Sequence, residues 1–280
     1  MCGVFDTKKD SGWQYTRDEL FKKIEKQNFE HINYVIVSGG EPTLYDYFFD
    51  LIKMLNEKQV KVVIFTNGRK FKDIDFTEKL KNCFYSDILI PLFGSNANIH
   101  DYFTQVRGSF DDTVQGLLNL DQAGMAYSIK NVVMNSNYKD LPDWAKFMTK
   151  NFKSSKEISI HGLHLQGEAP KAAEKIYVPH NTASPYIQQA LDILENSIEN
   201  ISISAIPLCT VDPYYWKYNL APNILDSIVI SEDSKEINNT NLGNYLESPE
   251  ECSNCSIRNL CVWPWKMYKK LYDLDYLKAY

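Results

Sequence analysis

The sequence predicts an α/β protein in which helices cover a parallel sheet, followed by a small, irregular, cysteine-rich segment. Three observations support this prediction. Short apolar runs alternate with amphipathic stretches through residues 1–206. Glycines and polar residues follow the apolar runs, where strands would end. From about Pro207 the alternation gives way to polar, aromatic-rich sequence that holds four of the six cysteines, which divides the chain into residues 1–206 and 207–280.

The elements can be placed in order from their local patterns. A first helix follows Thr16, because Thr16 and Glu19 form a capping-box pattern and apolar residues recur at helical spacing after them. Strands are expected at residues 34–38, 60–65, 87–92, 127–134, 157–164 and 200–206. Further helix starts are expected at Ser109-x-x-Asp112 and at Ser184-Pro185. Ligands of such sheets bind at the carboxyl ends of the strands, where Gly39, Thr66, Ser95, Asn135 and Gln166 fall.

Composition and charge exclude several classes of function. The 280 residues are 44% hydrophobic, enough for one large core and a small appendage. A formal net charge of -6 and a pI near 5.5 argue against a nucleic-acid partner, which usually leaves a basic surface. No apolar stretch approaches the roughly 20 residues that span a bilayer, and no signal peptide is recognisable. We therefore expect a cytoplasmic protein with no membrane partner and with reduced cysteines.

Residues 34–42, with the sequence YVIVSGGEP, join an apolar strand to two glycines, a carboxylate and a proline. Gly39 and Gly40 have no Cβ, so a ligand can approach their backbone and bind along it as an added strand edge. Glu41 offers a carboxylate to an ammonium group, and Pro42 suits the first turn of a following helix. The alternative is a plain strand-to-helix turn with an acidic residue at the positive end of the helix dipole.

This unit resembles the second strand of radical S-adenosylmethionine (radical SAM) enzymes, whose loop holds the methionine amino group. Residues 60–68, 88–110 and 132–142 resemble the third to fifth strands of that family and the loops after them. The resemblance implies that residues 1–206 form a partial (β/α)6-type TIM barrel lacking its first strand. It also implies that S-adenosyl-L-methionine binds at Gly39, Gly40, Glu41, Pro42, Thr66, Asn67, Ser95 and Asn135. Ser95 and Asn135 would bond the ribose or carboxylate, although short polar residues equally often cap local backbone.

The family holds a 4Fe-4S cluster on a CxxxCxxC motif, and an electron from this cluster cleaves S-adenosylmethionine to a 5'-deoxyadenosyl radical. This chain carries only Cys2, at the position of the last cysteine of that motif. A fragment of a longer protein and a degenerate relative both fit this departure. One thiolate cannot hold a cubane, so we expect this chain to cleave the cofactor inefficiently. We also expect an uncovered sheet edge beside residues 34–38.

The C-terminal cysteines form a second motif. Cys252-x-x-Cys255 places two thiolates on one turn, Cys261 follows, and Cys209 can supply a fourth ligand by folding back. Four thiolates suit either a tetrahedral zinc or a 4Fe-4S cluster, so the spacing leaves the metal open. The segment 207–280 resembles the SPASM or shorter twitch domains of peptide-modifying radical enzymes, which implies an auxiliary 4Fe-4S cluster. Cys83 is interpreted as a small buried hydrophobe.

The resemblance implies an oxidoreductase that modifies a peptide or protein and receives electrons from a donor such as flavodoxin or ferredoxin. No catalytic residue is assigned, and His161 and His164 are interpreted as packing residues. One alternative is a noncatalytic α/β binding protein stabilised by zinc or by a cluster. The other is a conventional barrel enzyme, which is disfavoured because P-loop, HExxH, GxSxG and GxGxxG motifs are absent.

Overall fold

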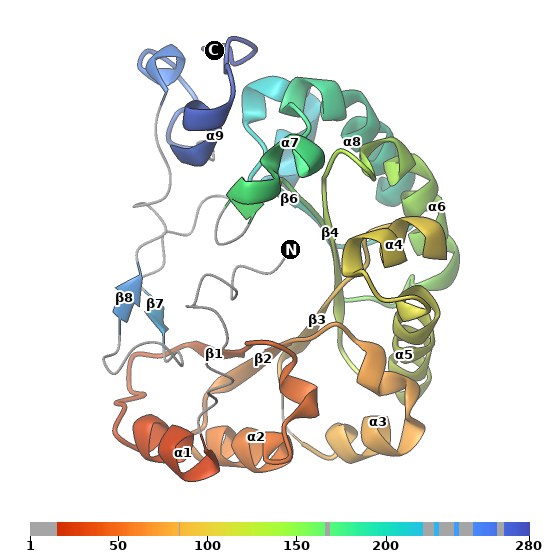
Figure 1. The fold of residues 1–280 in the computed structure, drawn as a ribbon, viewed down its shortest axis with the longest axis vertical. Coiled ribbons are helices and arrows are strands. Elements are labelled where there is room, and N and C mark those ends of the chain that lie inside the picture. Colours follow the sequence, from red (N-terminus) through yellow and green to blue (C-terminus); the bar gives the residue numbers. More distant parts are fainter. Residues whose placement is uncertain are drawn as a thin grey trace.

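The computed structural model describes residues 16–83, 85–165, 169–220, 227–229, 238–240, 249–261 and 266–280. Its centre is a six-stranded parallel sheet in the order β1-β2-β3-β4-β5-β6. The strands are β1 Tyr34–Val37, β2 Lys61–Phe65, β3 Asp87–Pro91, β4 Ser128–Val132, β5 Glu157–His161 and β6 Ile201–Ser204. Figure 1 shows them following an arc, so the sheet is a partial barrel with an inner and an outer face. The predicted α/β fold is therefore confirmed.

Helices connect the strands and cover the outer side of the arc (Figure 1). These covering helices are α1 Arg17–Glu25, α2 Phe48–Glu57, α3 Ile74–Lys81, α5 Ser109–Ala123, α6 Leu141–Asn151 and α8 His180–Glu195. Two shorter helices, α4 Ala97–Thr104 and α7 Ala173–Ile176, follow β3 and β5 in the chain. The core lies between sheet and helices: Val62, Ile64, Ile88 and Ile90 alternate along β2 and β3 and are completely buried.

The ends of individual helices test the local sequence patterns. The capping box at Thr16 is confirmed, since its side chain and that of Glu19 exchange hydrogen bonds with the opposite backbone. Helix α5 begins at Ser109 as predicted, after Gly108 in a left-handed conformation. The predicted start at Ser184-Pro185 is wrong, because α8 begins at His180 and contains Pro185. The apolar face of α8 packs on the core from Ala183 onward, and this packing outweighs the one backbone hydrogen bond that a proline removes.

The segment after β6 continues along the same sheet. The Leu220 N–H donates to the Ile203 carbonyl, and Asn219 forms a parallel bridge with Ile203. Beyond it come the antiparallel pair β7 Ser227–Val229 and β8 Asn238–Thr240, and then α9 Lys266–Leu271. At the opposite edge, β1 pairs with β2 alone among the described residues. None of the helices built from these residues has the length and apolar character to cross a membrane.

Candidate functional site

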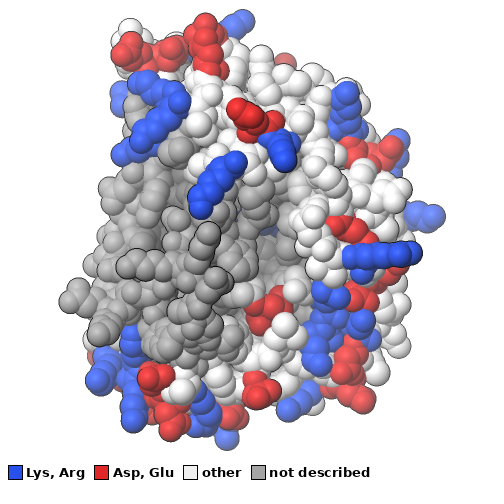
Figure 2. Space-filling model, viewed as in Figure 1, with Lys and Arg blue, Asp and Glu red and all other residues white. Residues whose placement is uncertain are grey.

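The carboxyl ends of the parallel strands meet at one rim of the partial barrel. Figure 2 shows the corresponding face of the molecule, with charged side chains around its periphery and a hollow near its centre. Most of the sequence-predicted ligand residues belong to the loops that leave β1 to β4 at this rim. Gln166 and Cys2 lie outside the described residues.

The loop after β1 leaves its backbone open. Gly39 has φ +148°, a conformation that side-chain-bearing residues rarely adopt. A Cβ built at Gly39 or Gly40 would meet no atom of the described residues within 4 Å. Pro42 begins a short 3-10 helix, Pro42–Leu44, with Glu41 as its N-cap. The described residues therefore leave the main-chain donors and acceptors of this loop accessible to a ligand.

The Glu41 carboxylate joins the ends of β1 and β2. Its Oε1 accepts hydrogen bonds from the Thr66 hydroxyl at 2.6 Å, from the Thr43 hydroxyl at 2.6 Å and from the Thr43 N–H at 3.2 Å. Its Oε2 accepts one from the Asn67 N–H at 2.7 Å. The structure thus brings four predicted site residues, Glu41, Pro42, Thr66 and Asn67, into one cluster. The N-cap contact of Glu41 with the Thr43 N–H agrees with the alternative of an acidic residue at the start of a helical turn, whereas its bonds to Thr66 and Asn67 were not predicted. Its contact with an ammonium group stays a prediction.

Ser95 and Asn135 lie on the next loops along the rim. The Ser95 hydroxyl and N–H donate to Asp140 at 2.6 and 2.7 Å. Burial raises the pKa of Asp140, and this effect outweighs the two hydrogen bonds, which lower it. Asn135 is exposed, and its N–H donates to the Ile176 carbonyl at 2.9 Å. The sequence reasoning missed Asn137, whose side-chain amide donates to the Phe93 and Val132 carbonyls and so ties β3 to β4.

Three further side chains were not predicted as site residues: Lys130 of β4, His161 at the end of β5, and His164 in the loop after β5. Inner-face positions alternate with core positions along β4, and Lys130 lies between the buried Ile129 and Asn131. Burial lowers the pKa of Lys130. Burial, and then the Lys130 charge, lower the pKa of His161 well below its usual range and that of His164 to about 3. A lysine inside an otherwise uncharged strand was the available sequence signal.

The C-terminal cysteines are neighbours in space. Burial, and then the nearby thiols of Cys209, Cys252 and Cys255, raise the pKa of Cys261 to about 12, although the hydrogen bond from the Leu208 N–H acts in the opposite direction. Backbone donors reach the sulfurs: the Leu208 N–H bonds Cys261 Sγ at 3.3 Å and the Tyr280 N–H bonds Cys255 Sγ at 3.5 Å. Such donors stabilise metal-bound thiolates. Among the described residues, no group of three or more His, Cys, Asp or Glu side chains is arranged to hold a metal ion.

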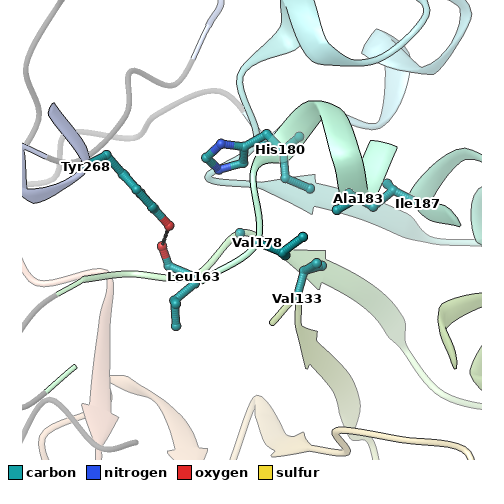
Figure 3. A pocket seen from close by; sticks show the side chains of 9 residues that line it. Val133, Leu163, Val178, His180, Ala183, Ile187 and Tyr268 are labelled. Carbon is teal, nitrogen blue, oxygen red and sulfur yellow. Dashed lines mark hydrogen bonds between the residues drawn. The ribbon is translucent and has the colours of Figure 1, made fainter. Parts of the chain in front are cut away.

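A tyrosine and histidine network joins the C-terminal segment to the barrel. Tyr268 of α9 donates its hydroxyl hydrogen to the Leu163 carbonyl, and His180 lies beside it at the wall of a small, mostly apolar cavity (Figure 3). The Tyr276 hydroxyl lies 2.9 Å from His180 Nδ1 and 3.1 Å from the Tyr177 hydroxyl. Burial lowers the pKa of His180 to about 4.

Comparison with known proteins agrees with the open glycine loop and the parallel barrel. The family model described as the radical SAM superfamily matches residues 1–148, more than half of the chain. The chain belongs to the radical SAM superfamily. Among curated radical SAM relatives, it is 30% identical over 152 residues to the mycofactocin maturase MftC of Mycobacterium tuberculosis, covering 53% of this chain and 38% of the relative. It is 28% identical over 131 residues to the AdoMet-dependent heme synthase of Methanosarcina barkeri, covering 47% of this chain and 35% of that protein.

These matches span only about a third of the length of the curated relatives. Among solved structures of radical SAM proteins, SuiB of Streptococcus suis bound to its precursor peptide SuiA superposes with a TM-score of 0.57 at 18% identity. That superposition covers 83% of this chain and 50% of SuiB. The likeness at this identity concerns the fold, and it extends over the partial barrel that carries the Gly39–Gly40 loop.

Proposed function

We propose that this radical SAM chain binds S-adenosylmethionine at the rim formed by the loops after β1 to β4, as part of an enzyme that modifies a peptide or protein. The observation that carries the proposal is the open backbone at Gly39 and Gly40, next to a carboxylate that fixes the loop. The similarity to a peptide maturase over half of the chain supports the substrate class.

Each rim residue has a task in this proposal. The backbone of Gly39 and Gly40 binds the methionine head group as an added strand edge. Glu41 positions that backbone by its hydrogen bonds to Thr66 and Asn67. Among the described residues its Oε2 accepts one hydrogen bond, so this oxygen has capacity to accept an ammonium hydrogen. Ser95 and Asn135 bond polar groups of the cofactor farther along the rim.

A 4Fe-4S cluster would supply the electron that cleaves the bound cofactor, delivered from a donor such as flavodoxin or ferredoxin. Cys2 is the one thiol in the sequence at the position of this cluster's ligands. The auxiliary metal centre is proposed at Cys209, Cys252, Cys255 and Cys261, supported by their proximity and by the N–H groups that reach two of the sulfurs. Four thiols equally suit zinc, which belongs to the alternative of a noncatalytic, metal-stabilised binding protein.

The substitution Gly40→Val tests the cofactor site with little risk to the fold. The Val side chain would enter the open space beside the loop, and the backbone of Gly40 lies outside the left-handed region. We expect the variant to unfold at the wild-type temperature yet to bind S-adenosylmethionine at least roughly tenfold more weakly, since a methyl-bearing side chain blocks the backbone edge. Isothermal titration calorimetry of the wild-type and variant chains with S-adenosylmethionine measures both affinities.

Gly124→Asn is the matched control, because Gly124 caps the end of α5 away from the rim. A Cβ there also meets no atom of the described residues within 4 Å, and asparagine tolerates the left-handed φ of +66°. Equal affinities of Gly40→Val and the wild type for S-adenosylmethionine would show that the cofactor does not bind at this loop. No binding of S-adenosylmethionine by the wild-type chain would contradict the proposed function itself.

A further inference from the structure

A carboxylate between the loops after β3 and β4 binds Ser95 through both of its oxygens. Asp140 Oδ2 accepts the Ser95 N–H at 2.7 Å, and Asp140 Oδ1 accepts the Ser95 hydroxyl hydrogen at 2.6 Å. Asp140 is the N-cap residue of α6, yet within the described chain its side chain makes no capping hydrogen bond. Both carboxylate oxygens are therefore directed at Ser95 and not at the helix end, which an N-cap aspartate usually binds.

Gly94 leaves room for this contact. It is buried, and a Cβ at its position would lie 2.5 Å from Ile99 Cγ2 and 3.4 Å from Asp140 Oδ2. A side chain here would displace Ile99 or the loop itself, so the glycine allows the backbone of Ser95 to lie against Asp140. The contact is thus part of the construction of the loop after β3.

The bonds to Asp140 leave Ser95 without a hydrogen to donate. Serine has two donors, its backbone N–H and its hydroxyl hydrogen, and its hydroxyl oxygen has two acceptor lone pairs. Asp140 accepts from both donors, and the Asn96 side-chain amide donates to the Ser95 oxygen at 3.1 Å. Among the described residues, one lone pair of this half-buried oxygen has no donor. A ligand group at this oxygen must therefore donate a hydrogen bond, which excludes a carboxylate.

We propose that Asp140 is a positioning residue, which holds Ser95 as a hydrogen-bond acceptor for a ribose hydroxyl of S-adenosylmethionine. This inference deepens the proposed function and rests on it, because it takes the Gly39–Gly40 loop as the site of the methionine head group. It also decides between the two cofactor groups expected at Ser95, since the ribose hydroxyls can donate a hydrogen and the carboxylate cannot.

The dimensions of the sheet and of the cofactor agree with this assignment. Strand β3 is two places from β1, a span of roughly 10 Å at about 4.8 Å per strand. About seven bonds separate the methionine Cα from a ribose hydroxyl, and they reach roughly 9 Å when extended. The carboxylate of the cofactor lies about 3 Å from its ammonium group and stays near β1. The ribose is therefore the part of the cofactor that reaches the loop after β3.

The test measures how strongly the protein prefers a hydroxyl to a fluorine on the ribose. The probes are S-adenosylhomocysteine and its 2′-deoxy-2′-fluoro and 3′-deoxy-3′-fluoro analogues, because fluorine is close to a hydroxyl in size but donates no hydrogen bond. Isothermal titration calorimetry with the full chain gives the three affinities. We expect the wild type to bind one of the two fluoro analogues roughly tenfold more weakly than S-adenosylhomocysteine, the effect of one lost hydrogen bond.

Asp140→Asn should reduce this preference. The amide oxygen accepts the Ser95 N–H, which cannot turn, so the amide NH2 faces the Ser95 oxygen and the hydroxyl hydrogen turns toward the ligand. We expect the preference to fall from roughly tenfold to about twofold or less. A merely structural role of Asp140 would instead weaken all three probes equally. Ser95→Ala, which keeps the N–H bond, should lose the preference as well, and it tests the contact if Asp140→Asn does not fold.

Asp143→Asn is the matched control, because Asp143 is an exposed aspartate on α6 that pairs with Lys146, and it should keep the wild-type preference. Equal binding of all three probes to the wild type, or equal weakening of all three in Asp140→Asn, would overturn the inference. Weaker binding in Gly40→Val would still support the proposed function in that case. If the wild type bound none of the probes, the inference would fall, and titration with S-adenosylmethionine would decide the proposed function separately.

Discussion

At the scale of single residues, Glu41 determines the shape of the candidate site. One carboxylate accepts four hydrogen bonds from three residues, and these residues come from the ends of two strands. The bonds to Thr43 shape the turn after Gly39 and Gly40, and those to Thr66 and Asn67 fix the turn to β2. Glu41 therefore holds the neighbouring glycine backbone in place. A backbone edge that is already rigid loses less conformational entropy when a ligand binds.

Glu41→Gln tests this role. The Gln side-chain amide can accept the bonds of one oxygen, but its NH2 group would face the Asn67 N–H, donor against donor. We expect the free energy of unfolding to fall by about 2 kcal/mol, the range for bonds to a charged acceptor. Urea denaturation followed by circular dichroism measures it. Glu57→Gln, at the exposed end of α2, is the control and should change stability by less than about 0.5 kcal/mol.

The residues around Glu41 also indicate what a sequence can reveal. The strand, glycine and proline pattern located the loop, because the backbone requirements of a glycine or proline are local. The partners of Glu41 were not predictable, since Thr66 and Asn67 are 25 and 26 residues away and meet it only through strand pairing. Lys130 was not predicted as a site residue for the same reason, because it comes near His161 only through the pairing of β4 with β5.

At the scale of elements, the joint between α8, β6 and the C-terminal segment depends on a buried histidine. His180 is the first residue of α8, and it bonds the Tyr276 hydroxyl and the backbone of Ala205 after β6. Aromatic rings of Tyr177, Tyr268 and Tyr272 stack around this contact. The ring is neutral in the folded state, because burial disfavours its charge.

This burial predicts acid sensitivity. The folded-state pKa of His180 is about 4, below an unfolded value of about 6.5, so the unfolded chain binds the proton more tightly. Stability is complete above pH 6.5 and declines as the pH falls toward 4. We expect His180→Gln to reduce this slope by about 1.4 kcal/mol per pH unit, the value for one proton, in urea titrations at several pH values.

Tyr276→Phe separates titration from packing at the same joint. It removes the hydroxyl partner of His180 but keeps the buried ring. It should lower stability at every pH and leave the slope as in the wild type. An unchanged slope in His180→Gln would show that the ring does not titrate on unfolding in this range.

Element boundaries followed the sequence where local chemistry decided them. The capping box of α1 formed as predicted, and all six strands of the large sheet lie within the expected runs, each shorter by one or more residues. Helix α8 did not, because a proline is a strong local signal for a helix start while the packing of Ala183 and Ile187 against the core acts at long range.

At the scale of the whole molecule, the cysteines occupy the junction between the sheet edge and the C-terminal segment. Cys261 accepts from Leu208 just after β6, and Cys255 accepts from Tyr280. The Asn219 side chain donates to the Leu260 carbonyl at 2.8 Å, and the rings of Trp216 and Tyr280 meet edge to face. A metal held by these thiols would link segments that are otherwise joined by a few hydrogen bonds and ring contacts.

Removal of one thiol should therefore release both the metal and the segment. In Cys255→Ala we expect the protein-bound metal to be lost, and amide hydrogens of residues 208–220 and 249–261 to exchange faster while β2 to β4 stay protected. Elemental and sulfide analysis of anaerobic protein gives the metal: iron with sulfide supports the cluster, and zinc supports the structural alternative. Cys83→Ala is the matched control, since Cys83 lies after α3 with its thiol near the Lys79 carbonyl. Full metal retention in Cys255→Ala, or equal loss of metal in Cys83→Ala, would show that the metal is not bound by the cysteines at this junction.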